Sequence, residues 1–354
     1  MAISSVNNIN QLLIRNIDTL TSICPLLVNI TDDGFIHHYR QTNLAQYPSA
    51  IIHSYHTNFA EYLLTKKIES EDVKAHFCVE YKAEKKHDLI IMAFPKSKAE
   101  FSFTLAMLAE SITDDAYIII VGENKGGIKS CEKLSKHYLR FCNKVDAARH
   151  CLLYVGKFKT ELPVFRIEDF YTYYQVTAGN HEIKVATLPG VFSQNSLDLG
   201  TEILLENLPS IISGEILDFG CGAGIIAAYI GTLHPEVKLS LVDVSALALY
   251  SAQETLALNQ LSGDFIASNS LSHVTKRYDF VVSNPPFHQG IKTNYTATEQ
   301  FLSTIKQNIT SGGCITIVAN SFLKYVPIME KTIGTTKTLA VKKGFSIYQC
   351  DINC

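Results

Sequence analysis

The sequence lacks the features that place a protein in a membrane or outside the cell. It contains no run of about 18 consecutive apolar residues, so no membrane-spanning helix is expected. Residues 1–8 have neither the basic start nor the apolar core of a secretory signal peptide. These absences predict a cytoplasmic protein.

The cysteines also lack an ordered arrangement. There are nine of them, an odd number, and no two are separated by the two residues that zinc ligands often show. A disulfide-stabilised secreted protein would show paired spacings, whereas scattered free thiols suit a reducing compartment. The sequence therefore predicts no metal site and again indicates the cytoplasm.

An excess of positive charge is missing as well. The net charge is −3, which argues against a protein that binds nucleic acid through its overall charge. One segment differs, because residues 125–159 contain nine lysines and arginines but only two acids. Spacings of three and four predict that several of these lie along one helix face, as a phosphate-binding patch or as an ordinary solvated face. The candidate RNA-binding residues are Lys125, Lys129, Lys133, Lys136, Arg140, Lys144 and Arg149.

What the chain does have is enough length and apolar content for two domains. Its 354 residues exceed the usual size of one domain, and 47% hydrophobic against 18% charged residues can fill large cores.

The most informative motif is Asn284-Pro285-Pro286-Phe287, which follows a predicted buried strand at residues 278–283. The Asn284 side-chain oxygen and the Pro285 carbonyl can both accept hydrogen bonds from an exocyclic NH2 group. The two prolines remove backbone donors and restrict the chain, and Phe287 offers a face on which a base can stack. These four candidate catalytic residues predict a reaction in which an amine is the nucleophile.

A glycine-rich turn upstream indicates the cofactor. A predicted strand at residues 215–219 leads into Gly220, Gly222 and Gly224, and a predicted helix follows at residues 225–233. Glycines allow a sharp turn and a close approach of the backbone to a ligand. A second predicted strand ends at Asp243, which is placed to bind a ribose diol.

Two cofactor classes share this spacing and must be separated. A dinucleotide-binding turn has a third glycine where this chain has Ile225, and this difference excludes a dehydrogenase. The acid before the glycines, Asp218, instead suits the cationic methionine end of S-adenosyl-L-methionine. A further predicted strand at residues 264–269 ends in Ser268 and Asn269, which can contact the adenine amine, although strand ends are often polar without a ligand. The candidate cofactor-binding residues are Asp218, Gly220, Gly222, Gly224, Asp243, Ser268 and Asn269.

The two halves of the chain look like copies of one unit. Residues 86–95 align with residues 277–286, and residues 116–124 align with residues 313–321. The first copy has Ala93 where the second has Asn284, and residues 25–34 replace its glycine turn. We therefore predict a doubly wound α/β fold that occurs twice, with a catalytically silent N-terminal copy.

These copies set the predicted domain limits. Residues 1–160 form the degenerate domain, residues 161–187 a connector with a short hairpin, and residues 188–354 the catalytic domain. A helix is expected at about residues 197–208. Phe192 just before it can cover the cofactor or belong to the core, and the sequence favours the core.

Taken together, the chain resembles the ribosomal RNA small subunit methyltransferase C family, which methylates the N2 amine of a guanine in 16S rRNA. The resemblance rests on residues 121–125, 143–149, 188–193, 217–224, 243–245, 267–269 and 283–290. It implies two tandem Rossmann-like class I methyltransferase domains, with the N-terminal domain supporting folding and RNA placement. It also implies S-adenosyl-L-methionine as cofactor and 16S rRNA in the 30S subunit as partner. Residues 194–196 depart from the charged pair and glycine that are common in the family.

Two other functions stay open from the sequence. The same amine-binding motif serves adenine N6 and protein glutamine, because it recognises an NH2 group and not a whole base. A non-catalytic RNA-binding assembly factor with a retained cofactor fold is the alternative from another class. A paired base must flip out of its helix to reach such a site. A monomer is expected, because two copies in one chain supply the interface that a dimer would.

Overall fold

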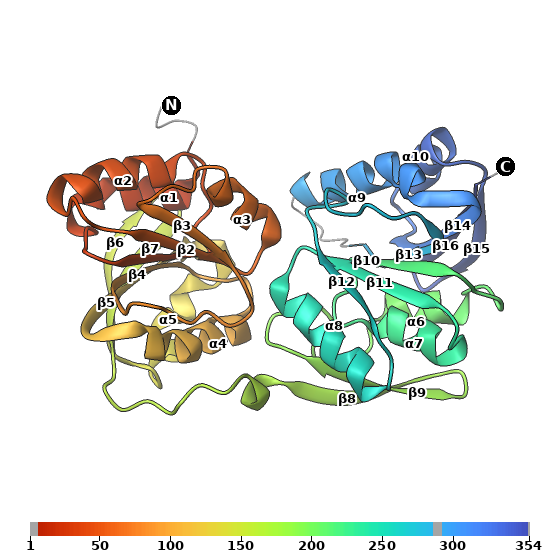
Figure 1. The fold of residues 1–354 in the computed structure, drawn as a ribbon, viewed down its shortest axis with the longest axis horizontal. Helices are drawn as coiled ribbons and strands as arrows, with labels where there is room; N and C mark the ends of the chain where they lie inside the picture. Colours follow the sequence, from red (N-terminus) through yellow and green to blue (C-terminus); the bar gives the residue numbers. More distant parts are fainter. Residues whose placement is uncertain (1–5, 286–291, 353–354) are drawn as a thin grey trace. The chain divides into compact units, whose positions relative to one another are not determined.

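The computed structural model describes residues 6–285 and 292–352, and side chains for residues 6–285 and 298–352 (Figure 1). Contacts divide the chain into two compact units, residues 1–170 and 171–354. None of the described helices is long and apolar enough to cross a membrane.

The first unit is built on a seven-stranded sheet in the order β3-β2-β1-β4-β5-β7-β6. All neighbours are parallel except β7, which is antiparallel to β5 and β6. Its elements are α1 (Asn8–Arg15), η2 (Ile17–Thr19), β1 (Pro25–Val28), α2 (Phe35–Gln46), β2 (Ile52–His56), α3 (Phe59–Lys66), β3 (Val73–Phe77), β4 (His87–Ala93), α4 (Lys98–Leu108), η3 (Ala109–Ser111), β5 (Ile112–Glu123), η4 (Asn124–Gly126), η5 (Ile128–Ser130), α5 (Cys131–Ser135), β6 (Leu139–Ala148), β7 (Cys151–Phe158) and η6 (Ile167–Phe170).

The second unit repeats this plan with the order β12-β11-β10-β13-β14-β16-β15. Its elements are β8 (Thr172–Ala178), β9 (His181–Thr187), α6 (Leu199–Glu206), β10 (Glu215–Phe219), α7 (Ile225–Leu233), β11 (Lys238–Asp243), α8 (Ala246–Leu258), β12 (Gly263–Ala267), β13 (Tyr278–Ser283), α9 (Lys292–Thr304), η7 (Ile305–Asn308), β14 (Ile309–Asn320), α10 (Tyr325–Thr332), β15 (Thr336–Lys342) and β16 (Phe345–Asp351). The hairpin β8–β9 forms a separate two-stranded sheet that packs on α8. The matching strand order confirms the predicted tandem α/β fold.

Helices cover both faces of each sheet (Figure 1). In the first unit α1, α2 and α3 lie on one face and α4 and α5 on the other; in the second unit α6, α7 and α8 lie opposite α9 and α10. Central strands buried from both sides must be apolar throughout, which explains why every residue of β1 is buried. In such a fold ligands bind at the carboxyl ends of the strands, where the strand order reverses between β10 and β13.

One hydrogen bond recurs at the same place in both units. Asp88 at the start of β4 accepts from the backbone N–H of Cys24 (2.8 Å), and Asp279 at the start of β13 accepts from that of Glu215 (2.9 Å). Each bond joins the beginnings of the two central strands. This is a structural reason for the aspartate that the two copies share.

The basic segment corrects one expectation. It is not a single helix: residues 125–159 contain two short 3-10 turns, the five-residue α5 and the hairpin β6–β7. The end of the basic segment is extended because β6 pairs with β7. In the sheet order, β6 is the edge strand and β7 lies between it and β5. The helix propensity of the individual residues is only a weak predictor, and strand pairing in the folded protein overrides it.

Candidate active site

A cavity of about 490 Å³ lies at the carboxyl ends of the strands in the second unit. Its lining includes residues of β10, β11, β14 and β16 and the residues that directly follow β12 and β13. It brings together seven residues predicted from the sequence, namely Gly220, Gly222, Asp243, Ser268, Asn269, Asn284 and Pro285. The cavity does not include the predicted Asp218 and Gly224 in its lining.

The glycine turn has two different roles. Gly220 and Gly222 have positive φ angles of 70° and 51°, and they line the cavity. A Cβ at Gly220 would meet no atom within 4 Å, and one at Gly222 would touch only the Phe192 Cβ at 4.0 Å. At Gly224, by contrast, a Cβ would lie 2.9 Å from the Ala252 Cβ on α8. The first two glycines therefore leave space for a ligand, and the third allows helix packing.

Asp218 is buried behind the cavity surface. Its Oδ2 accepts a hydrogen bond from the Ala227 N–H in the first turn of α7 (3.1 Å), while its Oδ1 has no partner among the described residues. Burial raises the pKa of Asp218 to about 7, and the nearby Asp243 carboxylate adds to this shift. Asp218 shares the feature of a buried oxygen without a partner with several other described residues, and it does not itself line the cavity.

Asp243 ends β11 and lines the cavity. Its Oδ2 accepts from the Gly222 N–H (3.0 Å) and its Oδ1 from the Ser245 N–H (2.9 Å). Burial raises the pKa of this carboxyl group too. Each carboxylate oxygen has a second lone pair, so the side chain is held in place with acceptor capacity left for hydroxyl groups.

Ser268 and Asn269 follow β12 at the edge of the same cavity. Ser268 is buried, its Oγ accepts from the His273 N–H (3.0 Å), and its own N–H donates to the Asp243 carbonyl (3.1 Å). Asn269 is exposed. The strand end thus fixes Ser268 and leaves the amide of Asn269 near the opening.

Asn284 is held at the end of β13 by a set of short contacts. The Ser283 hydroxyl donates to the Phe219 carbonyl (2.7 Å), which joins the ends of β13 and β10. The Asn284 Nδ2 donates to the Thr201 Oγ1 (2.8 Å) and to the Asp198 Oδ2 (3.2 Å). Because both amide hydrogens have partners, Oδ1 is the part of this side chain that remains as an acceptor. Pro286 and Phe287, the other predicted catalytic residues, lie outside the described residues.

The structure also adds residues to the cavity that the sequence did not predict. Phe192 is 53% exposed and lines the cavity, so its assignment to the core was wrong. Asp198 lines the cavity as the N-cap of α6. An acid before an apolar helical stretch signals a cap in the sequence, but nothing there pairs it with Asn284, 86 residues away.

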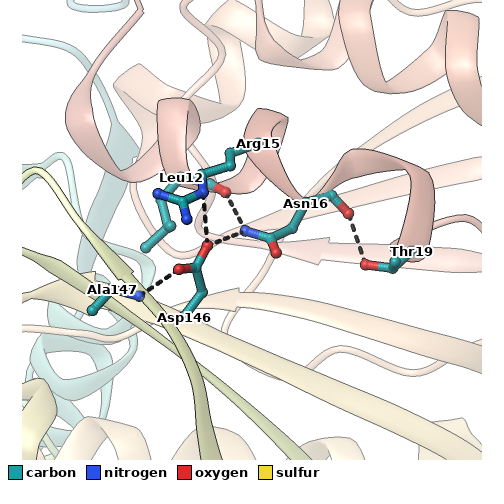
Figure 2. A network of polar contacts seen from close by, with 6 residues as sticks. All are labelled: Leu12, Arg15, Asn16, Thr19, Asp146 and Ala147. Atoms are coloured by element: carbon teal, nitrogen blue, oxygen red, sulfur yellow. Dashed lines mark hydrogen bonds and ion pairs between the residues drawn. The ribbon is translucent and has the colours of Figure 1, made fainter.

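The candidate RNA-binding residues all lie in the first unit, spread over two 3-10 turns, α5, β6 and the turns next to these elements. All seven are exposed, and none of them is in an ion pair within the described part of the chain. The acid of β6, Asp146, is instead occupied by α1 (Figure 2): the Arg15 Nε lies 3.3 Å from its Oδ2, and the Asn16 Nδ2 donates to the same oxygen (2.8 Å). Among the described residues, Asp146 therefore pairs with Arg15 and Asn16 and not with Arg140 or Lys144 of its own strand.

Comparisons with known proteins agree with this architecture. The Methyltransferase small domain family matches residues 182–349, and the Methyltransferase small domain N-terminal family matches residues 10–174. A protein of Colwellia psychrerythraea, named Ribosomal RNA small subunit methyltransferase C, is 51% identical over 99% of both chains. A protein of the same name from Pseudoalteromonas translucida is 40% identical over 98% of this chain and 99% of its own.

Among solved structures, the T. thermophilus 16S rRNA N2 G1207 methyltransferase in complex with AdoMet and guanosine has a TM-score of 0.81. It is 20% identical, and the match covers 96% of this chain and 92% of that one, which shows a shared fold. The full-length relatives above carry the assignment further and confirm the resemblance found in the sequence. The chain belongs to the ribosomal RNA small subunit methyltransferase C family.

Proposed function

We propose that this protein transfers the methyl group of S-adenosyl-L-methionine to the exocyclic N2 of a guanine in 16S rRNA. The observation that carries the proposal is the cavity in which a fixed Asn284 amide faces the same space as the glycine turn and Asp243. Family membership supports the substrate, and the T. thermophilus protein of the same fold is described with AdoMet and guanosine.

The residues of the cavity fit the cofactor. The open backbone at Gly220 and Gly222 admits a ligand, and Asp243 keeps acceptor capacity for a ribose diol. Ser268 and Asn269 are placed to contact an adenine ring. The cofactor supplies a methyl group already activated on a positively charged sulfur. A cationic ligand near Asp218 and Asp243 favours their ionised forms and so offsets the cost of burying these carboxylates.

The protein then has to place and activate the amine. The lone pair of guanine N2 is delocalised into the ring, which makes it a weak nucleophile. When the Asn284 Oδ1 and the Pro285 carbonyl accept its two N–H bonds, the nitrogen becomes more tetrahedral and the developing charge is stabilised. Holding it in line with the methyl group supplies the rest of the catalysis. Phe287 stacks on the flipped base in this proposal.

The first unit provides RNA contacts without chemistry. Its exposed basic residues, unpaired within the described chain, suit the phosphates of 16S rRNA in the 30S subunit. We assign them this role, with the protein acting as a monomer in the cytoplasm.

The test is methyl transfer from labelled S-adenosyl-L-methionine to 30S subunits, free 16S rRNA, tRNA, DNA and a release-factor protein in parallel. Digestion of the labelled RNA to nucleosides identifies the modified atom. We expect N2-methylguanosine from 16S rRNA. Label in adenine or in protein glutamine would overturn the substrate but keep the amine-binding site. Absence of label from every substrate would favour a non-catalytic assembly factor.

A further inference from the structure

The side-chain amide of Asn284 can be held in two ways, and only one serves the reaction. Its oxygen and nitrogen have the same shape, so a rotation by half a turn exchanges an acceptor for a donor. With Oδ1 toward the cavity the side chain accepts an N–H of the substrate amine. With Nδ2 in that place it would repel the same N–H. Something in the protein must therefore select the first orientation.

Two groups from the first turn of α6 face this amide. The Asp198 Oδ2 lies 3.2 Å from the Asn284 Nδ2, and the Thr201 Oγ1 lies 2.8 Å from it. A hydroxyl such as that of Thr201 can donate or accept, so it does not distinguish the two orientations. An ionised carboxylate can only accept. Asp198 therefore selects the orientation in which Nδ2 points to α6 and Oδ1 is left for the substrate.

The position of Asp198 is itself determined by the helix. As the N-cap of α6 it accepts from the Thr201 N–H (3.1 Å) with the same Oδ2 that faces Asn284. Gly200 permits this arrangement, since a Cβ there would come within 3.0 Å of both the Asp198 Oδ2 and the Phe345 Cε1. Thr201 is buried, so its hydroxyl has little freedom to move away.

We propose that Asp198 and Thr201 are positioning residues for Asn284: Thr201 anchors the amide in place, and Asp198 selects the orientation with the oxygen toward the amine to be methylated. The inference rests on the proposed function only in that Asn284 accepts an N–H of the nucleophile. It does not depend on which base or side chain carries the amine.

The experiment is a double-mutant cycle on turnover with the full-length protein. Asp198→Ser keeps a helix-capping oxygen but is too short to reach Asn284, and Thr201→Val keeps the shape but removes the hydroxyl. We expect each to lower kcat about 10-fold. The cofactor KM and the melting temperature should change little. In an Asn284→Ala background the same two substitutions should have almost no further effect, because the amide they orient is gone.

Conservative variants and a cap control sharpen the cycle. Asp198→Asn and Thr201→Ser should keep most of the wild-type turnover, because the Thr201 N–H holds an amide oxygen at position 198 toward Asn284 and serine retains the hydroxyl. Ser97→Ala removes the N-cap of α4 in the other unit, where Ser97 accepts from the Glu100 N–H, and so measures the effect of losing a cap alone.

The outcomes test the positioning role of Asp198 and Thr201 separately from the proposed methyl transfer to guanine N2. If Asp198→Ser lowers kcat equally with and without Asn284, or leaves it unchanged in the wild-type background, the positioning role is overturned. If the wild-type protein methylates an amine other than guanine N2, the proposed substrate fails, and the cycle is carried out on that amine. A protein that transfers no methyl group overturns both.

Discussion

Asn29 and Gly220 occupy the same place in the two units. Each directly follows the central strand, each has a positive φ angle (53° and 70°), and each donates its N–H to the neighbouring strand at 2.8 Å, to the Tyr55 or the Val242 carbonyl. The side chain of Asn29 then accepts from the N–H and hydroxyl of Thr57. Gly220 has no side chain, and its place opens into the cavity. The fold needs only a residue that tolerates this φ, whereas an open cavity at this place needs glycine.

The other site positions differ in the same way. Strand register aligns Asp218 with Leu27, Asp243 with His56 and Asn284 with Ala93. His56 is buried, and its Nε2 lies within hydrogen-bonding distance of the Ser54 and Thr65 hydroxyls. Both units keep the hydrogen bond in which Asp88 or Asp279 accepts a backbone N–H and so joins the two central strands. The comparison teaches that the two units share the residues that build the sheet and differ at the positions proposed to bind the cofactor and the amine.

The largest effect on turnover is expected when Asn284 is replaced by alanine, the residue that the first unit has at the matching position. Asn284→Ala should lower turnover by at least ~100-fold, from a lost transition-state contact of roughly 3 kcal/mol. Cofactor binding should be nearly unchanged, since the contact is to the amine. Rates at saturating cofactor and calorimetric titration with S-adenosylhomocysteine check this. A variant that loses cofactor binding but keeps its saturated rate would contradict the assigned role.

The buried acid of the second unit should appear in the pH dependence of stability. The pKa of Asp218 is raised to about 7 in the folded chain, so its contribution is fully present below the unfolded pKa of about 3.9 and is lost as pH rises through 7. Asp218→Asn removes this dependence, which amounts to roughly 2.5 kcal/mol between pH 5 and pH 8.

Urea unfolding of the cofactor-free protein at both pH values measures this difference. Burial also raises the pKa of Glu100 in the first unit to about 7. Because Glu100 is present in both the wild type and Asp218→Asn, its contribution to the pH dependence cancels when the two are compared. Equal pH slopes for the wild type and the variant would show that Asp218 is not the group responsible.

Exchanging the residues after the central strands tests the role of Gly220 directly. Gly220→Asn should weaken S-adenosylhomocysteine binding by about 10-fold or more, which is about 1.4 kcal/mol, because the new side chain enters the cavity. The backbone should tolerate it, since asparagine accepts this φ. Asn29→Gly is the matched control and should leave cofactor affinity unchanged. Binding unaffected by Gly220→Asn would mean that the ligand does not approach this turn.

Charge reversal probes the contribution of the first unit to RNA binding. Changing Lys133, Lys136 and Arg140 to Glu should raise the RNA KM several-fold, roughly 1 kcal/mol, and should flatten its salt dependence. Reversing the exposed Lys67, Lys85 and Lys86 of the same unit changes the net charge equally and serves as the control. Equal effects of the two triple variants would assign the result to net charge, and an unchanged KM would make the segment an ordinary solvated surface.

Prediction from the sequence worked best where the signals are local. The strand predicted at residues 215–219 is β10 with the same limits, and the helix predicted at residues 225–233 is α7. An apolar run, a glycine turn and a second apolar run are short-range features that the surrounding fold supports. The helix predicted in the basic segment failed, because β6 forms by pairing with β7, and that pairing is a tertiary effect.

By itself, the sequence determined the duplicated fold, the glycine turn and the acid at the end of the second strand, and it predicted the amine-binding motif, because each depends on residues that are close along the chain. Only the tertiary structure decided which glycine faces the cavity and which packs on Ala252, that Phe192 lines the cavity, and that Asp198 and Thr201 accept hydrogen bonds from the Asn284 amide. The physical reason is that these properties arise from contacts between segments far apart in sequence, whose approach is determined by packing of the whole sheet and its helices.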